Sequence, residues 1–270
     1  MSKPLHIVLL SYHNQNGGAG IAAGRLQQAL KKAGHQVTYL VQEKSGNDGS
    51  ELIRKGLWVK LGNWIRFILE RLYFLPSEKS KSIRFLFNPG LIGQDISQHP
   101  AIQQADIIHL HWVNFGFLSI KNIEQLLKLG KPVIWTLHDM WAFTGGCHHS
   151  GECVNFQTNC GSCKFVNKPE RWDISHRMWA DKLYAFDYPN LHIITCSDWL
   201  KSRAEKSTIL AYHNIESIPN AIDTNFFQRE ENAKKILKLN PEKQYILFVA
   251  MRVNTPTKGF KYLKEALQIW

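Results

Sequence analysis

HIVLLSY at residues 6–12, followed by GGAG at residues 17–20 and by a helical pattern over residues 21–33, decides the fold class. The first run is short, apolar and rich in β-forming residues, which is typical of a buried strand. The helical pattern ends at Gly34, and glycine commonly closes a helix. The chain therefore opens with a strand, a glycine-rich connection and a helix, the repeating unit of an α/β fold.

Further strands and helices continue this alternation. The predicted strands lie at residues 36–41, 105–112, 132–137 and 191–196. Between them, residues 121–129 are predicted to form a helix closed by Gly130. The strands are almost continuously apolar, which indicates burial on both faces and hence a parallel sheet. The sequence predicts a doubly wound, Rossmann-like α/β domain.

The predicted domain organisation is uneven. Residues 1–227 are expected to form one complete domain, whereas residues 228–270 begin with a charged, lysine-rich connection. After it, a strand is predicted at residues 245–250 and a helix at residues 258–270. One strand and one helix cannot bury a core. We therefore expect only the first β-α unit of a second domain, and hence a C-terminally truncated chain.

The composition is ordinary for a soluble protein, but the net charge is unusual. The formal net charge is +11, from 33 Lys and Arg against 22 Asp and Glu. Such an excess favours anionic partners such as nucleic acid, phosphate esters or anionic lipid. The sequence has no recognisable signal peptide and no apolar run of membrane-spanning length. We expect a cytoplasmic protein whose cysteines are reduced thiols or metal ligands.

Residues 57–75 show apolar side chains at helical spacing, with cationic residues between them. A cationic amphipathic helix that carries Trp58 and Trp64 suits an anionic membrane surface. The alternative is a helix packed on the core with a solvated basic face, because every surface helix is amphipathic. The sequence leaves both interpretations open.

The glycines Gly17, Gly18 and Gly20 lie between the first strand and its helix. Glycine lets the backbone approach a ligand closely, and a helix N-terminus favours an anion. Residues 18–23 fit the dinucleotide pattern G-x-G-x-x-A, so an NAD-dependent oxidoreductase is one alternative. Five residues separate the strand from Gly18, however, and the dinucleotide turn is tight. A longer loop that lines a cleft fits better.

Residues 145–164 form a cysteine-rich insert. Cys147, Cys153, Cys160 and Cys163 have the spacing C-x5-C-x6-C-x2-C. The last pair has the spacing of half a structural zinc site, and the first pair is looser than usual. A structural zinc site is therefore one hypothesis, and four reduced thiols in an ordered loop is the other. A basic nucleic-acid-binding protein with such a zinc site is a further alternative, although no recognisable nucleic-acid-binding module is present.

Polar residues follow two strands at the sheet edge where α/β proteins bind ligands. His109 and His111 alternate along one strand and therefore share a face. His138 and Asp139 come directly after another strand. We expect His138 to be the functional residue of this group.

Arg252 and Lys258 flank the predicted turn between the last strand and its helix, and Gly259 follows them. Two cations beside a helix N-terminus are suited to holding a diphosphate. An ordinary surface Arg and Lys is the alternative when this run is taken alone.

In this order, these features resemble a retaining glycosyltransferase of the GT-B fold, family 4 or "group 1". The glycine run, TLHD at residues 136–139 and Arg252 with Lys258 match motifs of that family. IPNAID at residues 218–223, followed by Phe226, resembles its "IPNGID…F" signature with alanine in place of glycine. The cysteine-rich insert resembles that of a subgroup that assembles exopolysaccharide, capsule or colanic acid.

The resemblance implies a function. The donor would be an NDP-sugar, whose diphosphate Arg252, Lys258 and Gly259 would grip. His138 would be catalytic, Gly17, Gly18 and Gly20 would form an acceptor or phosphate loop, and His111 and Asp139 would line the acceptor cleft. The acceptor would be a lipid-linked or other glycan at the inner face of the plasma membrane, and residues 57–75 would hold the protein there.

Neither a cofactor for catalysis nor a nucleic-acid partner is expected. The family's acidic E-x7-E element should lie beyond residue 270, so this chain alone is expected to have little or no activity.

Overall fold

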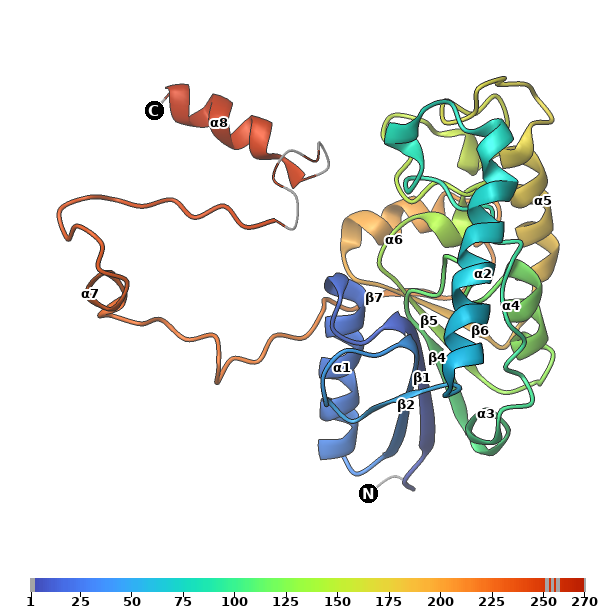
Figure 1. Cartoon of the computed structure of the whole chain (residues 1–270), viewed down its shortest axis with the longest axis horizontal. Coiled ribbons are helices and arrows are strands. Elements are labelled where there is room, and N and C mark those ends of the chain that lie inside the picture. The colour runs from blue at the N-terminus through green and yellow to red at the C-terminus, as the bar shows by residue number, and fades with distance from the viewer. Residues whose placement is uncertain (1–2, 251–252, 254, 256–257, 270) are drawn as a thin grey trace. The chain divides into compact units, whose positions relative to one another are not determined.

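The computed structural model describes residues 3–250, 253, 255 and 258–269 (Figure 1). It divides into two compact units, residues 1–222 and residues 223–270. Each unit is described by itself.

The first unit is built on one parallel sheet, with strand order β3-β2-β1-β4-β5-β6-β7. Its strands are β1 (His6–His13), β2 (Gln36–Glu43), β3 (Ser50–Leu52), β4 (Ile107–Leu110), β5 (Val133–Leu137), β6 (Leu191–Thr195) and β7 (Ile215–Ser217). The order reverses between β1 and β4, which is the topological switch point of a doubly wound fold. The predicted α/β class and parallel sheet are therefore confirmed.

Helices flank this sheet. They are α1 (Gly17–Lys32), α2 (Leu57–Phe74), α3 (Pro100–Gln104), α4 (Ile120–Leu127), α5 (Ile174–Ala185) and α6 (Asp198–Glu205). Side chains cap several of them. Ser119 forms a capping box with Asn122 at α4, and Asp173 accepts backbone N–H bonds at the start of α5. Such caps satisfy N–H groups that have no partner inside the helix.

The core is divided by the sheet into two clusters. Leu9 and Tyr39 pack on one face with Ala23 of α1. Leu10, Leu110 and the residues of α4 and α5 make the larger cluster on the other face. Figure 1 shows the same layers, with α1 on one side of the sheet and α2, α4 and α5 on the other. Both faces are covered, which explains why the strands are almost continuously apolar.

The glycine run differs from the prediction, because it belongs to the helix rather than to a loop. Helix α1 begins at Gly17, four residues before the predicted start. Gly20 lies in its first turn, and a Cβ atom there would come within 2.4 Å of the carbonyl oxygen of His13. Only glycine lets the helix start this close to the end of β1, so the glycine signal marks backbone packing as well as a possible ligand site.

The second unit contains two described helices, α7 (Ala233–Ile236) and α8 (Phe260–Ile269). The strand predicted at residues 245–250 is not formed, although all six residues are described. A strand needs a neighbour for its backbone hydrogen bonds, and none of the described residues provides one there. Among the helices that the structure describes, in either unit, none combines the length and apolarity needed to cross a bilayer.

Candidate functional site

Three histidines gather where β4 and β5 end. His109 lies in β4, His111 follows it, and His138 follows β5. The two strands are adjacent and parallel, with Leu110 opposite Trp135. Residues beyond their carboxyl ends therefore meet at one edge of the sheet, as the sequence predicts.

The three imidazole rings form a stack. The ring centres of His109 and His111 are 4.7 Å apart, and those of His111 and His138 are 5.4 Å apart. Nε2 of His109 lies 2.8 Å from Oγ1 of Thr136, and Nδ1 of His111 lies 3.1 Å from Nε2 of His138. These hydrogen bonds fix the orientation of each ring.

The stack is held in the neutral form. Burial lowers the pKa of His109 to about 3 and that of His138 to about 4. Burial places the pKa of His111 well below its ordinary value, and electrostatic repulsion from His109 and His138 in their protonated forms lowers it further. At neutral pH the rings therefore act through hydrogen bonds and not as cations.

Asp139 forms several hydrogen bonds at this edge of the sheet. Its carboxylate accepts from Nε1 of Trp112 at 3.0 Å and from the backbone N–H of Trp141 at 2.8 Å, and lies 2.8 Å from Nδ1 of His148. Burial alone would raise the pKa of Asp139, but His148 and the N–H donors outweigh it and the pKa is lowered. Asp139, predicted to line the acceptor cleft, is thus engaged in holding the loop that follows His138.

A large cavity lies beside this edge. It has a volume of about 580 Å³ and is bounded by helix α2 and by residues at the carboxyl ends of β1 and β2. Tyr12, one of its lining residues, makes an edge-on ring contact with Trp112 at 5.9 Å. Trp112 in turn donates to Asp139. The cavity is therefore linked by direct contacts to the residue next to His138.

The four cysteines of the insert converge on one small cavity of about 20 Å³. Burial raises the pKa of Cys147 and Cys160 to about 12 and that of Cys163 to about 11. In the described part of the chain, no three His, Cys, Asp or Glu side chains are arranged so that they could hold a metal ion. The thiols are gathered, but the structure offers no ready set of metal ligands, and the zinc site stays a prediction.

The predicted donor residues fall in the second unit or outside the described residues. Arg252 lies outside them. Lys258 is exposed, and Gly259 adopts a positive φ of 76° immediately before α8. The Lys258 backbone N–H donates to the carbonyl of Thr255 at 2.9 Å. The predicted diphosphate grip therefore stays a prediction.

Several candidate residues were not found from the sequence. The residues Glu43, Lys44, Arg54 and Lys60 line the cavity with Tyr12, and their shared location depends on how α2 packs. Lys182 is fully buried, donates to the carbonyls of Trp141 and Thr144, and has its pKa lowered by burial to about 7. A lysine on an amphipathic helix gives no sign of such burial in the sequence.

Two comparisons with known proteins bear on this site. The model of a family described as Glycosyltransferase Family 4 matches residues 16–226. The chain is also 30% identical over 92 residues to the putative colanic acid biosynthesis glycosyl transferase WcaC of Escherichia coli (strain K12). That match covers 32% of this chain and 22% of the relative, so the chain matches well under two thirds of the relative's length.

Proposed function

Since the chain belongs to glycosyltransferase family 4, we propose that it moves a sugar, with retention, from an NDP-sugar to a membrane-associated glycan acceptor in bacterial polysaccharide synthesis. The family membership supports glycosyl transfer, and the partial likeness to a putative colanic acid transferase supports the pathway. Departure of the diphosphate would be assisted by Arg252 and Lys258. Attack of the acceptor on the same face of the sugar requires neither a protein nucleophile nor a catalytic metal.

The observation that carries this proposal is the neutral histidine stack at the carboxyl edge of the sheet. Nε2 of His138 is engaged by His111, so Nδ1 is its ring nitrogen without a hydrogen-bond partner in the described part of the chain. A neutral imidazole can donate a hydrogen bond to a sugar hydroxyl or a phosphate oxygen. Preorganised donors of this kind are often the largest contribution to catalysis.

The stack also favours one tautomer of His138. Nε2 of His111 is buried and has no partner among the described residues. If it carried the proton, an N–H donor would be buried without an acceptor, which is costly. The proton of His111 is better placed on Nδ1, from which it donates to Nε2 of His138. His138 then carries its own proton on Nδ1 and presents a donor to the substrate.

Membrane association forms the second part of the proposal. Helix α2 exposes Trp58 (84% of its surface) and Trp64 (61%) together with several leucines. Apolar and cationic side chains on one exposed helix suit an anionic bilayer surface. We place the protein at the inner face of the plasma membrane, where lipid-linked acceptors and cytoplasmic NDP-sugars meet.

The test measures transfer of labelled sugar from a set of NDP-sugars into the lipid fraction of bacterial membranes, with protein expressed from its intact gene. We expect transfer from one donor, and a loss of about 10²-fold or more in His138→Ala. His192→Ala is the matched control, because His192 is an exposed histidine on β6. No transfer from any donor, or equal rates in the two variants, would contradict the proposal. Elemental analysis of the same protein tests the predicted zinc.

A further inference from the structure

Helix α2 is attached to the first unit along its C-terminal half, where Arg66 donates to the carbonyl of Gly116 at 3.2 Å. Only three of its residues, Glu70, Arg71 and Phe74, are buried. The Glu70 carboxylate accepts the backbone N–H groups of Gly90 at 2.6 Å and Ile92 at 2.8 Å. The first three turns of the helix contain no buried residue. They stand over the cavity of about 580 Å³, which we call the α2 cavity.

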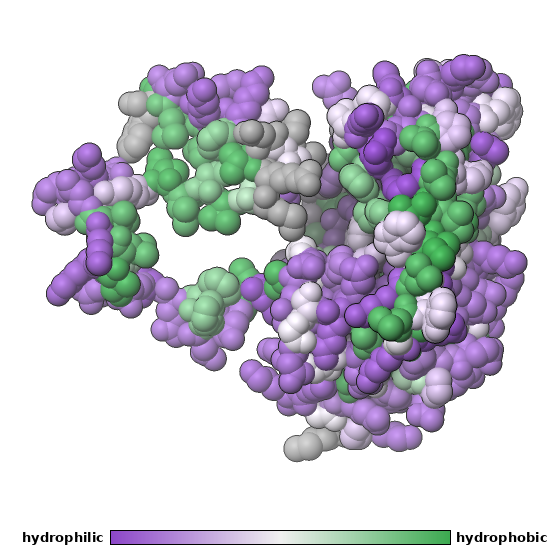
Figure 2. Space-filling view, in the orientation of Figure 1, coloured by the Kyte–Doolittle hydropathy of each residue, from purple (hydrophilic) through white to green (hydrophobic). Residues whose placement is uncertain are grey.

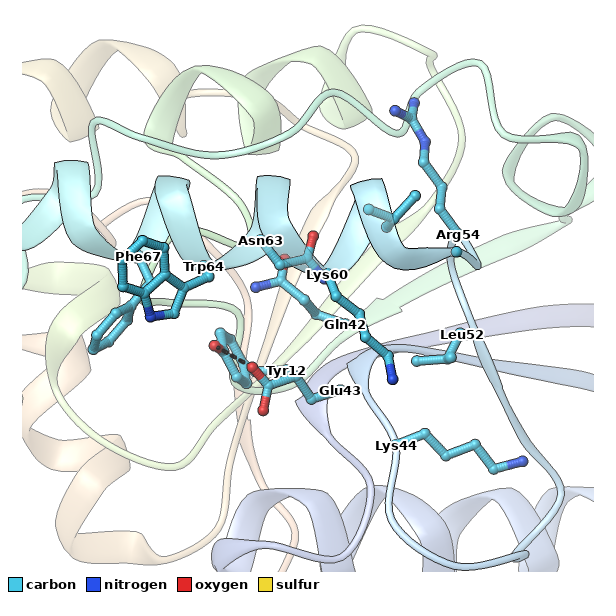
Figure 3. A pocket seen from close by; sticks show the side chains of 12 residues that line it. Tyr12, Gln42, Glu43, Lys44, Leu52, Arg54, Lys60, Asn63, Trp64 and Phe67 are labelled. Atoms are coloured by element: carbon cyan, nitrogen blue, oxygen red, sulfur yellow. Dashed lines mark hydrogen bonds between the residues drawn. The ribbon is translucent and has the colours of Figure 1, made fainter.

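The α2 cavity is cationic. Lys44, Arg54 and Lys60 line it, against one carboxylate, that of Glu43. The Glu43 carboxylate already accepts the hydroxyl of Tyr12 at 3.0 Å and lies 3.6 Å from His13. Figure 3 shows the Lys60 side chain extending from α2 toward the strand ends, with Lys44 on the facing segment. The excess of positive charge suits an anion such as a phosphate.

Lys60 is the cation best placed to receive such an anion. Its side chain is exposed and makes no hydrogen bond or ion pair in the described part of the chain. Lys44 donates to the carbonyl of Ser50 at 2.7 Å, which leaves two of its three protons for a ligand. Arg54 makes one long hydrogen bond, of 3.5 Å, to the carbonyl of Asp95.

Apolar side chains also line the α2 cavity. They are Leu52, Val59, Trp64 and Phe67. The apolar surface continues outside the cavity, where the exposed residues Leu57, Trp58, Leu61, Ile65, Leu69 and Leu72 follow along α2. Figure 2 shows apolar residues gathered along this helix. Single exposed apolar residues are ordinary, but a continuous exposed strip of them indicates an interaction surface.

An anion site that opens onto an apolar strip fits a ligand with both characters. We propose that the α2 cavity binds the phosphate-bearing head of an amphiphile whose hydrocarbon chain lies against α2. In the proposed transferase this amphiphile is the lipid-linked acceptor, so its role rests on the proposed function, whereas its binding does not. Contacts from Tyr12 through Trp112 to Asp139 connect this cavity to the residue next to His138.

Flotation of the full chain with vesicles tests this proposal without any sugar donor. The vesicles are phosphatidylcholine alone, phosphatidylcholine with a long-chain isoprenyl phosphate, and phosphatidylcholine with phosphatidylglycerol at equal charge. We expect binding to the isoprenyl phosphate vesicles to be at least about fivefold tighter than to the phosphatidylglycerol vesicles. The reason is that the cavity adds a specific phosphate contact to the attraction between surface cations and an anionic bilayer.

Two variants and two matched controls locate the site. Lys60→Glu should weaken binding to isoprenyl phosphate vesicles about tenfold, because it replaces an attractive charge with a repulsive one. Trp64→Ser should weaken it similarly by removing apolar contact. Lys32→Gln on α1 and Trp199→Ser on α6, exposed residues outside the cavity, should change nothing. Circular dichroism verifies that each variant is folded.

The contrary outcomes are distinct. Equal binding to both anionic vesicles, unchanged by Lys60→Glu, would mean adsorption to charged surfaces and would overturn the cavity site. Binding of inorganic diphosphate, measured by calorimetry, without any binding to the vesicles would mean a free phosphate ligand and would overturn the amphiphile. A protein that transfers sugar but binds no isoprenyl phosphate would refute this inference alone. One that binds it but transfers nothing would refute the proposed function alone.

Discussion

Nδ1 of His111 lies 3.1 Å from Nε2 of His138, and the two rings are stacked with an angle of 23° between their planes. This pair is the centre of the candidate site. A hydrogen bond between two imidazoles requires one donor and one acceptor, so at least one ring must be neutral. Burial lowers the pKa of both histidines, so both rings are neutral at neutral pH.

The first prediction concerns acid stability. In the unfolded chain, histidines take up protons near pH 6.5. In the folded chain the pKa values of His109, at about 3, and His138, at about 4, are depressed. Below pH 6.5 the unfolded state therefore binds more protons, and the free energy of unfolding falls as the pH falls. The expected loss is about 1.4 kcal/mol per pH unit for each buried histidine.

Urea unfolding between pH 7 and about pH 5 measures this slope. His109→Gln keeps a hydrogen-bonding group near Thr136 but removes one titrating ring, so it should flatten the slope. His192→Gln, at an exposed position, should leave the slope unchanged. An unaltered slope in His109→Gln would show that the stack does not cause the pH dependence.

The second prediction concerns the tautomer of His138. His111→Leu removes the donor to Nε2 of His138 and should lower kcat on the order of 10²-fold with little change in KM. His111→Asn can place an amide N–H near the position of Nδ1 and should recover much of that loss. ¹⁵N shifts of His138 should show the proton on Nδ1 in the wild-type protein. A proton on Nε2 would refute the assignment.

The third prediction compares two glycines of the same helix. Gly20→Ala would place a Cβ atom 2.4 Å from the carbonyl oxygen of His13 and 2.9 Å from that of Asn14. Since both contacts are to backbone, α1 must shift, and we expect a loss of about 1–3 kcal/mol in the free energy of unfolding. Gly24→Ala meets nothing within 4 Å and should stabilise the helix by up to about 1 kcal/mol. Equal effects of the two substitutions in urea unfolding would contradict this account.

The fourth prediction concerns the attachment of α2. Glu70→Gln replaces an oxygen that accepts a buried backbone N–H with an NH₂ group that cannot accept it. We expect a loss of about 1–3 kcal/mol, with faster hydrogen exchange in α2. Glu124→Gln breaks a surface pair with Lys128 and should cost less than about 1 kcal/mol. Unchanged exchange in α2 would show that Glu70 does not hold the helix.

The sequence was sufficient for the five central strands of the sheet, but not for its short edge strands β3 and β7 or for the site beside it. An apolar strand such as residues 132–137 is recognisable alone, because burial on both faces leaves a continuous pattern. For α2, periodicity indicates the apolar face but not whether the core covers it. Its exposed Trp64 and the cavity beneath depend on the distant Gly90 and Ile92, which hold the helix through Glu70.

Other differences have similar causes. His111 and His138 were both predicted at the strand ends, yet their contact depends on the register of β4 against β5. The cysteine spacing indicated neighbouring thiols but could not fix their side-chain geometry. The strand predicted at residues 245–250 has the composition of a strand and, in the described structure, no partner.

The sheet has a consequence for assembly. Both of its edge strands, β3 and β7, are only three residues long, at Ser50–Leu52 and Ile215–Ser217. A long free edge is a template on which another chain can add a strand, and short edges deny that template. Lateral growth of this sheet into aggregates or swapped dimers is therefore disfavoured. If α2 holds the protein at a bilayer as proposed, its concentration there would not lead to polymerisation through the backbone.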